Sequence, residues 1–258
     1  MPQAADRPAP EVRVLGITGM PEVAPGDDIA ALVIDAAAAQ GTALLDGDVL
    51  VVTQKIVSKA EGRLVELKTV EPSEMAREYA RRWGKDARQV EVVLREASRI
   101  VRMDRGVLIV ETKHGFVCAN AGVDASNTGR PGFVTLLPED CDASAERIRA
   151  EIVRRAGVDV SVIISDSFGR PWRAGIDQVA LGVAGLLPLR DYTGETDPDG
   201  YELRVTQVAL ADEIAAAAEL VMGKLERIPV AIIRGYVAPA GAGSGRQLLR
   251  EPEKDLFR

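Results

Sequence analysis

Short apolar runs alternate along the chain with longer segments in which apolar residues recur every three or four positions. The apolar runs are rich in Val and Ile and are bounded by Gly, Pro, Asn or Asp, which is typical of buried strands. They predict strands at 12–17, 49–53, 107–110, 134–137, 158–164 and 230–233, and one that includes Val65 and Leu67. Helical periodicity covers 28–40, 73–103 with a break near Gly84, 144–155 and 209–222.

The predicted strands and helices follow one another irregularly, which favours an α+β fold of mixed sheets with helices over a regular βαβ wind. The segment 115–132 is rich in Gly, Asn, Asp and Ser and has little helical or strand periodicity. We expect residues 1–10 to be a disordered extension and residues 11–240 to form one domain. The tail, 241–258, opens with Gly-Ala-Gly-Ser-Gly and is expected to be flexible.

The composition narrows the classes of function. Of the 258 residues, 47% are hydrophobic and 28% are charged, which indicates a folded chain, and the net charge is -7. A protein that binds nucleic acid through phosphates needs an excess of clustered Lys and Arg, so nucleic acid is not an expected partner. No run approaches the roughly 18 apolar residues of a membrane helix, and the N-terminus shows no apolar signal segment. A cytoplasmic protein that does not bind membranes is therefore expected.

Few residues are available for thiol, imidazole or zinc chemistry. The chain has one histidine, His114, and two cysteines, Cys118 and Cys141. A structural zinc site normally takes four Cys or His ligands, and two cysteines in a chain of this size do not make a disulfide framework. Chemistry is therefore expected from carboxylates, Lys, Arg, backbone amides and a hard cation such as Mg²⁺ or Mn²⁺.

Three segments carry candidate chemistry, although no G-x-x-x-x-G-K-[ST] motif is present. Lys55, Lys59 and Arg63 follow the apolar strand 49–53, and they suit either a polyphosphate or a solvated basic edge. Asp166 follows the most apolar strand, where it could bind a metal or cap a turn. Asp124 lies in the irregular segment and could ligate a hard cation or form an Asx turn.

Several blocks, taken in order, resemble one family, the F420 gamma-glutamyl ligases (coenzyme F420-0:L-glutamate ligases). The resemblance extends over about 14–237, and the ordered series is more specific than any single block. The blocks are Leu15-Gly16-Ile17, Met20-Pro21-Glu22-Val23, Pro25-Gly26-Asp27-Asp28, Val57-Ser58-Lys59-Ala60-Glu61-Gly62-Arg63, Gly122-Val123-Asp124-Ala125-Ser126-Asn127, Asp166-Ser167-Phe168-Gly169-Arg170-Pro171-Trp172-Arg173, Ala211-Asp212-Glu213-Ile214 and Met222-Gly223-Lys224.

The resemblance implies a GTP-dependent ligase that joins L-glutamate to coenzyme F420-0, using Mg²⁺ or Mn²⁺ and also K⁺. It implies a non-P-loop α+β fold and an intertwined homodimer, which agrees with the missing P-loop motif. GTP would phosphorylate the terminal carboxylate of F420-0, and the amine of glutamate would attack the acyl phosphate, with a further gamma-linked glutamate as a second round. Some actinobacterial relatives continue into a flavin-binding reductase domain, and no reductase activity is expected of these 258 residues.

By matching positions, the resemblance makes Asp124 and Asp166 catalytic residues and metal ligands, together with Ser167. Gln54 stands where some relatives carry Ser near the nucleotide, and Lys224 where some archaeal members carry Gln as a ligand of a second metal. The nucleotide-binding residues that it implies are Met20, Pro21, Glu22, Val23, Gln54, Lys59, Asn127, Met222, Gly223, Lys224 and Pro229.

Two other functions suit the same residues. One is a noncatalytic module that binds a nucleotide or a deazaflavin, and the other is a metal-dependent phosphohydrolase. A pure binder has no need of the paired carboxylates Asp124 and Asp166, which favours an enzyme. Phosphate release that requires glutamate would distinguish a ligase from a hydrolase.

Overall fold

A five-stranded mixed sheet organises the chain in the computed structural model, which describes residues 9–256. The strand order is β1-β12-β2-β8-β9, and β2 and β8 are the parallel pair in an otherwise antiparallel sheet. The strands are β1 (Arg13–Gly16), β2 (Val49–Thr53), β8 (Ser161–Gly169), β9 (Ile176–Ala184) and β12 (Val230–Arg234). The predicted α+β class is confirmed.

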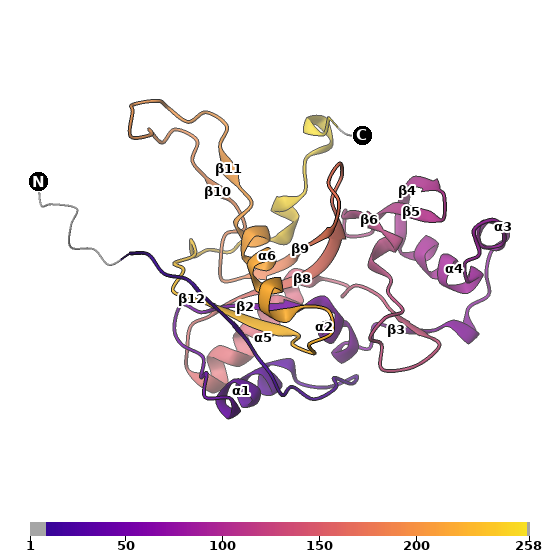
Figure 1. Cartoon of the computed structure of the whole chain (residues 1–258), viewed down its shortest axis with the longest axis horizontal. Coiled ribbons are helices and arrows are strands. Elements are labelled where there is room, and N and C mark those ends of the chain that lie inside the picture. Colours follow the sequence, from indigo (N-terminus) through magenta and orange to yellow (C-terminus); the bar gives the residue numbers. More distant parts are fainter. Residues whose placement is uncertain (1–8, 257–258) are drawn as a thin grey trace, which may run out of the picture.

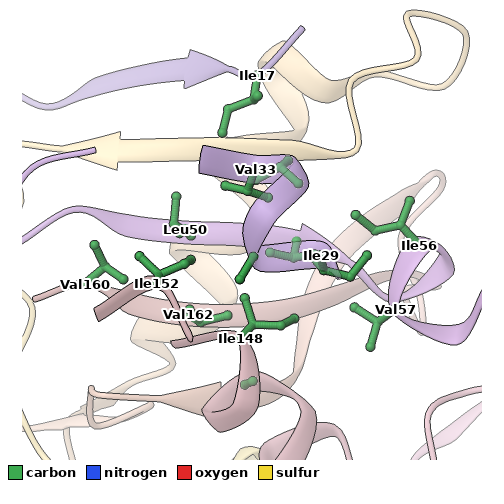
Figure 2. Close-up of a cluster of buried hydrophobic side chains, with 14 of the residues drawn as sticks. Ile17, Ile29, Val33, Leu50, Ile56, Val57, Ile148, Ile152, Val160 and Val162 are labelled. Carbon is green, nitrogen blue, oxygen red and sulfur yellow. The ribbon is translucent and has the colours of Figure 1, made fainter. Parts of the chain in front are cut away.

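Helices cover both faces of this sheet, which explains why its central strands are almost continuously apolar. Helices α1 (Ile29–Ala39), α2 (Gln54–Ala60) and α5 (Cys141–Ala156) pack on one face, and α6 (Leu210–Met222) packs on the other. Figure 2 shows the first of these cores, where side chains from α1, α2 and α5 meet strands β2 and β8.

Residues 64–135 form a second lobe with a hydrophobic core of its own, seen beyond β8 and β9 in Figure 1. A pair of strands, β3 (Leu64–Glu66) and β7 (Phe133–Thr135), links this lobe to the body. The rest of the lobe consists of η2 (Leu67–Thr69), α3 (Glu74–Trp83), α4 (Ala87–Glu96), β4 (Ala97–Asp104), β5 (Val107–Thr112), β6 (Val117–Ala119) and η3 (Asn120–Gly122).

The strands and helices differ from the predicted ones in several places; Leu67, for example, lies in η2 and not in a strand, and β10 and β11 were not predicted. The helical pattern assigned to 73–103 ends at Glu96, and β4 follows because its backbone pairs antiparallel with β5. Strand β9 was not predicted, and its pairing extends β8 from Ile164 to Gly169. Part of the segment predicted to be irregular, 117–119, pairs with β5 as strand β6. In β4, β6 and β9 long-range pairing overrides the local pattern.

An arm of the chain, residues 189–208, projects from the body beside α6 (Figure 1). It is closed at its base by β10 (Arg190–Asp191) and β11 (Gln207–Val208). In the described part of the chain no helix combines the length and the apolar character that crossing a bilayer requires.

The C-terminal tail packs on the body, which differs from the flexible coil that its glycines predict. Ser244 caps η4 (Gly245–Leu248); its Oγ donates to Asp142 Oδ2 at 2.6 Å, and the Gly245 amide donates to Asp142 Oδ1 at 2.8 Å. A Cβ at Gly245 would collide with the carbonyl of Leu181. The glycines therefore allow close backbone approach rather than flexibility. A second turn, η5 (Pro252–Lys254), follows, and most of the predicted N-terminal extension, 1–8, lies outside the described residues.

Candidate functional site

Asp166 lies inside β8, opposite Val179 of β9, rather than at the end of its strand. Successive side chains on a strand point to opposite faces of the sheet. Ile164 belongs to the core under α1 and α5, and Ile163 to the core under α6. Asp166 therefore points to the side of α2, whereas Ser167 points to the side of α6.

A first group of polar side chains, the Asp124–Asp166 cluster, forms on the α2 side of the hairpin made by β8 and β9. Lys55 makes an ion pair with Asp124, and its Nζ donates to the Ser126 carbonyl oxygen at 2.9 Å. Gln54 is 1% exposed, and its Oε1 accepts from Ser58 Oγ at 2.8 Å, which leaves its amide to donate to Asp166. The start of α2 thus presents a cation and an amide to two carboxylates.

The two carboxylates differ in their electrostatics. Burial raises the pKa of Asp166 to about 6, and the nearby charge of Asp124 adds to this, while the Ser167 amide and Lys55 oppose it. Burial also favours a higher pKa for Asp124, but the hydrogen bonds from Lys55 and Ser126 outweigh it and hold that pKa below its usual value. In this arrangement Lys55 neutralises Asp124, and Asp166 is the less satisfied anion.

A second group, the Ser167–Glu219 cluster, forms on the α6 side. Gln178 of β9 lies directly across from Ser167, and its Nε2 donates to Ser167 Oγ and to Glu219 Oε2, both at 2.9 Å. Lys224 donates to the same Ser167 oxygen, and its Nζ is 3.3 Å from Glu219 Oε1. The two clusters adjoin through the peptide bond between Asp166 and Ser167.

Lys59 and the segment that contains Glu22 meet on the α2 side of the sheet. The Lys59 side chain is only 6% exposed and makes an ion pair with Glu22, whose side chain is 71% exposed. Gly129 lies against the Glu22 carboxylate, and Asn127 of the same loop is exposed in the left-handed region at φ 50°. Three segments far apart in sequence, each predicted to bind the nucleotide, therefore lie together.

The remaining predicted nucleotide residues are placed differently. Val23 and Met222 belong to the two hydrophobic cores, so their side chains are closed to a ligand. Gly223 lies exposed at the end of α6, and the Pro229 carbonyl accepts from the Thr53 amide at 2.9 Å. Met20 is half-buried, and Pro21 is exposed.

The sequence did not identify Gln178 or Glu219 as site residues. Gln178 lies on the strand that was not predicted, and Glu219 is one of several acidic residues on an amphipathic helix. In the sequence, Lys55 is only one of three cations that follow the strand 49–53. Gln178 and Glu219 lie 41 positions apart, and Lys55 and Asp124 lie 69 positions apart, so no local pattern signals these pairs.

The oxygen donors suit a hard divalent cation. No group of three or more His, Cys, Asp or Glu side chains in residues 9–256 is arranged to hold a metal. Two carboxylates, Asp124 and Asp166, with the remaining positions left to water and substrate oxygens, match the way proteins bind Mg²⁺. Thiolate chemistry is disfavoured, because burial raises the pKa of Cys118 and of Cys141 to about 12.

Comparison with known proteins identifies the family. The sequence profile described as F420-0:Gamma-glutamyl ligase matches residues 18–235. The chain is 49% identical to the coenzyme F420:L-glutamate ligase of Methanothermobacter thermautotrophicus over 252 residues, which is 96% of this chain and 99% of the relative. It is 46% identical to the Methanopyrus kandleri protein of that name over 254 residues, covering 96% and 98% of the two chains. The chain therefore belongs to the F420-0:gamma-glutamyl ligase family.

Proposed function

We propose that this protein is a GTP-dependent ligase that joins L-glutamate to coenzyme F420-0 through an amide bond. The observation that carries the proposal is the match to proteins named coenzyme F420:L-glutamate ligase along almost their entire length. The Asp124–Asp166 cluster supports it, because two neighbouring carboxylates can hold the divalent cation that phosphoryl transfer uses.

The proposed reaction has two steps. A carboxylate oxygen of F420-0 attacks the γ-phosphorus of GTP, and the bond to GDP breaks, which gives an acyl phosphate. The amine of L-glutamate then attacks the acyl carbon, the amide C–N bond forms, and inorganic phosphate leaves with the electron pair of its C–O bond. The amine loses its proton to a base or to solvent. Phosphorylation is needed because a free carboxylate has no good leaving group.

Different residues of this chain would bind the metal, bind the phosphates and compensate charge. Asp124 and Asp166 would hold Mg²⁺ or Mn²⁺, which when bound supplies charge neutralisation at the triphosphate. Lys59 would bind phosphate oxygens as a point charge, with exposed Glu22 releasing it when the nucleotide arrives. The Asn127 loop would lie against the nucleotide. Lys55 would compensate for Asp124 whenever the cation is absent.

A homodimer is part of the same proposal. On the projecting arm Tyr201 is 64% exposed and Val205 is 90% exposed. Apolar side chains in such positions are what a partner subunit would cover.

Mass spectrometry of the products tests the proposal. We expect F420-0, L-glutamate and GTP together to give F420-0 enlarged by one glutamyl residue, and by two if a gamma-linked glutamate follows. Phosphate release should require all three substrates. Phosphate release from GTP without glutamate would instead favour a phosphohydrolase, and nucleotide binding without any product would favour a noncatalytic module.

Replacing Lys59 by Met is expected to weaken GTP binding by about 1 to 3 kcal/mol, or about 5- to 150-fold in Kd, because one charged hydrogen-bond donor is lost. Met keeps the aliphatic stem, which is buried in α2. Titration calorimetry with a nonhydrolysable GTP analogue measures the change. Lys68→Met, at an exposed position of η2, is the control and should bind like the wild type. Equal affinities for all three proteins would remove Lys59 from the nucleotide site.

A further inference from the structure

The Ser167–Glu219 cluster joins four separate parts of the chain at one point. Ser167 comes from β8, Gln178 from β9, Glu219 from α6, and Lys224 from the loop between α6 and β12. Gln178 is 3% exposed, and Glu219 and Lys224 have side chains 26% and 51% exposed. The cluster is thus built outward from a buried amide to a solvent-facing ammonium.

The hydrogen bonds fix how the Gln178 amide is oriented. A carboxylate only accepts hydrogen bonds, so the Gln178 nitrogen has to face Glu219, and the same nitrogen reaches Ser167 Oγ. Gln178 Oε1 is then buried and has no hydrogen-bond partner within residues 9–256. The Gln178 nitrogen is therefore fixed between Ser167 and Glu219.

The same contacts determine where the Lys224 ammonium lies. A lysine on an exposed loop has a flexible stem, and ordering that stem costs side-chain entropy. Glu219 Oε1 and Ser167 Oγ hold its Nζ together, and Glu219 is itself held by Gln178. Ser167 directly follows Asp166 in the chain. The Lys224 ammonium therefore lies next to the Asp124–Asp166 cluster, but on the α6 side of the β8–β9 hairpin, whereas that cluster is on the α2 side.

We propose that Glu219 and Gln178 are positioning residues that hold the Lys224 ammonium and the Ser167 hydroxyl where the γ-phosphate of GTP has to bind. The inference rests on the proposed function and names residues that act on that site without touching the substrate. Glu219 acts through Lys224, so its removal should matter only while Lys224 is present. Gln178 acts through both Glu219 and Ser167.

A double-mutant cycle on the full chain tests this, with steady-state ligation measured against GTP and against L-glutamate. We expect Glu219→Gln and Lys224→Met each to raise the KM for GTP about tenfold and to leave the KM for glutamate within about twofold. The double variant should be no worse than about twice the poorer single variant, because both changes remove the same held ammonium. Lys224→Arg should recover most of the loss. Glu78→Gln, exposed on α3, is the control and should match the wild type.

Several outcomes would overturn the proposal. They are losses that multiply in the double variant, equal effects on both KM values, a Glu219→Gln variant indistinguishable from wild type, and a Glu219→Gln variant that melts far below wild type. The last would make Glu219 a purely structural residue. If wild type itself forms no glutamyl product from GTP, the proposed function fails instead, and the two failures are separate.

Discussion

Replacing Asp166 by Asn is expected to lower ligase turnover by about three orders of magnitude, equivalent to about 4 kcal/mol. The proposed role of Asp166 is to hold a divalent cation together with Asp124, and Asn keeps the shape of the side chain while removing its charge. Turnover measured against Mn²⁺ concentration should show partial recovery at high Mn²⁺, because the variant binds the cation more weakly.

Melting of the metal-free protein separates this role from a structural one. Asp166→Asn should melt at or above the wild-type temperature, because burial already disfavours the carboxylate charge. Asp35→Asn, exposed on α1, is the matched control and should leave turnover and melting unchanged. Turnover of the Asp166 variant within a few-fold of wild type would exclude a role in catalysis, and a sharply lowered melting temperature would indicate a structural one.

Truncation after Val237 is expected to lower the melting temperature by about 10 °C. The deletion removes two hydrogen bonds to Asp142 and the packing of Leu248 and Leu249 on the body. These contacts together contribute about 3 to 5 kcal/mol, and each kcal/mol shifts the melting of a domain of this size by about 2 to 4 °C.

The matched control is a truncation after Arg250, which keeps η4 and removes η5. Its melting temperature should fall by less than a third of the drop expected for the truncation after Val237, because η5 contains no buried residue. Differential scanning calorimetry of the two truncated proteins and the wild type gives the comparison. Equal melting of all three would mean that the tail contributes nothing to stability and that the flexible tail predicted from the glycines describes the protein better.

The sequence predicted elements well where one segment determines its own structure. Asp28 caps α1 as its position before an apolar helix suggests, and β2 matches its predicted bounds 49–53. The sequence predictions were wrong where a segment distant in the chain determines the local structure. Residues 97–104 continue a helical pattern, but they form strand β4 because β5 pairs with them. The glycine at 245 allows the backbone to lie close to Leu181. Neither partner can be recognised from the local pattern.

The same limit applies to the candidate site. Asp124, Asp166 and Lys59 are predicted site residues because they belong to motifs of consecutive residues. The side to which each points could not be found in that way, because it depends on the extension of β8 by β9. Gln178 and Glu219 come from separate elements and meet only in the folded chain.

Because Asp166 and Ser167 point to opposite sides of the sheet, the number of residues that precede them in β8 cannot change without exchanging those sides. The register of β8 and β9 shifts between Ile164 and Ser165, and this irregularity fixes which residues pair from Ser165 to Gly169. Inserting or deleting one residue between this irregularity and Asp166 would turn every later side chain to the other face, so the carboxylate would leave Lys55 and enter the side of Glu219. The turn at 170–175 carries no such constraint. The number of residues from Ser165 to Ser167 therefore has to stay the same if Asp166 and Ser167 are to keep their two sides.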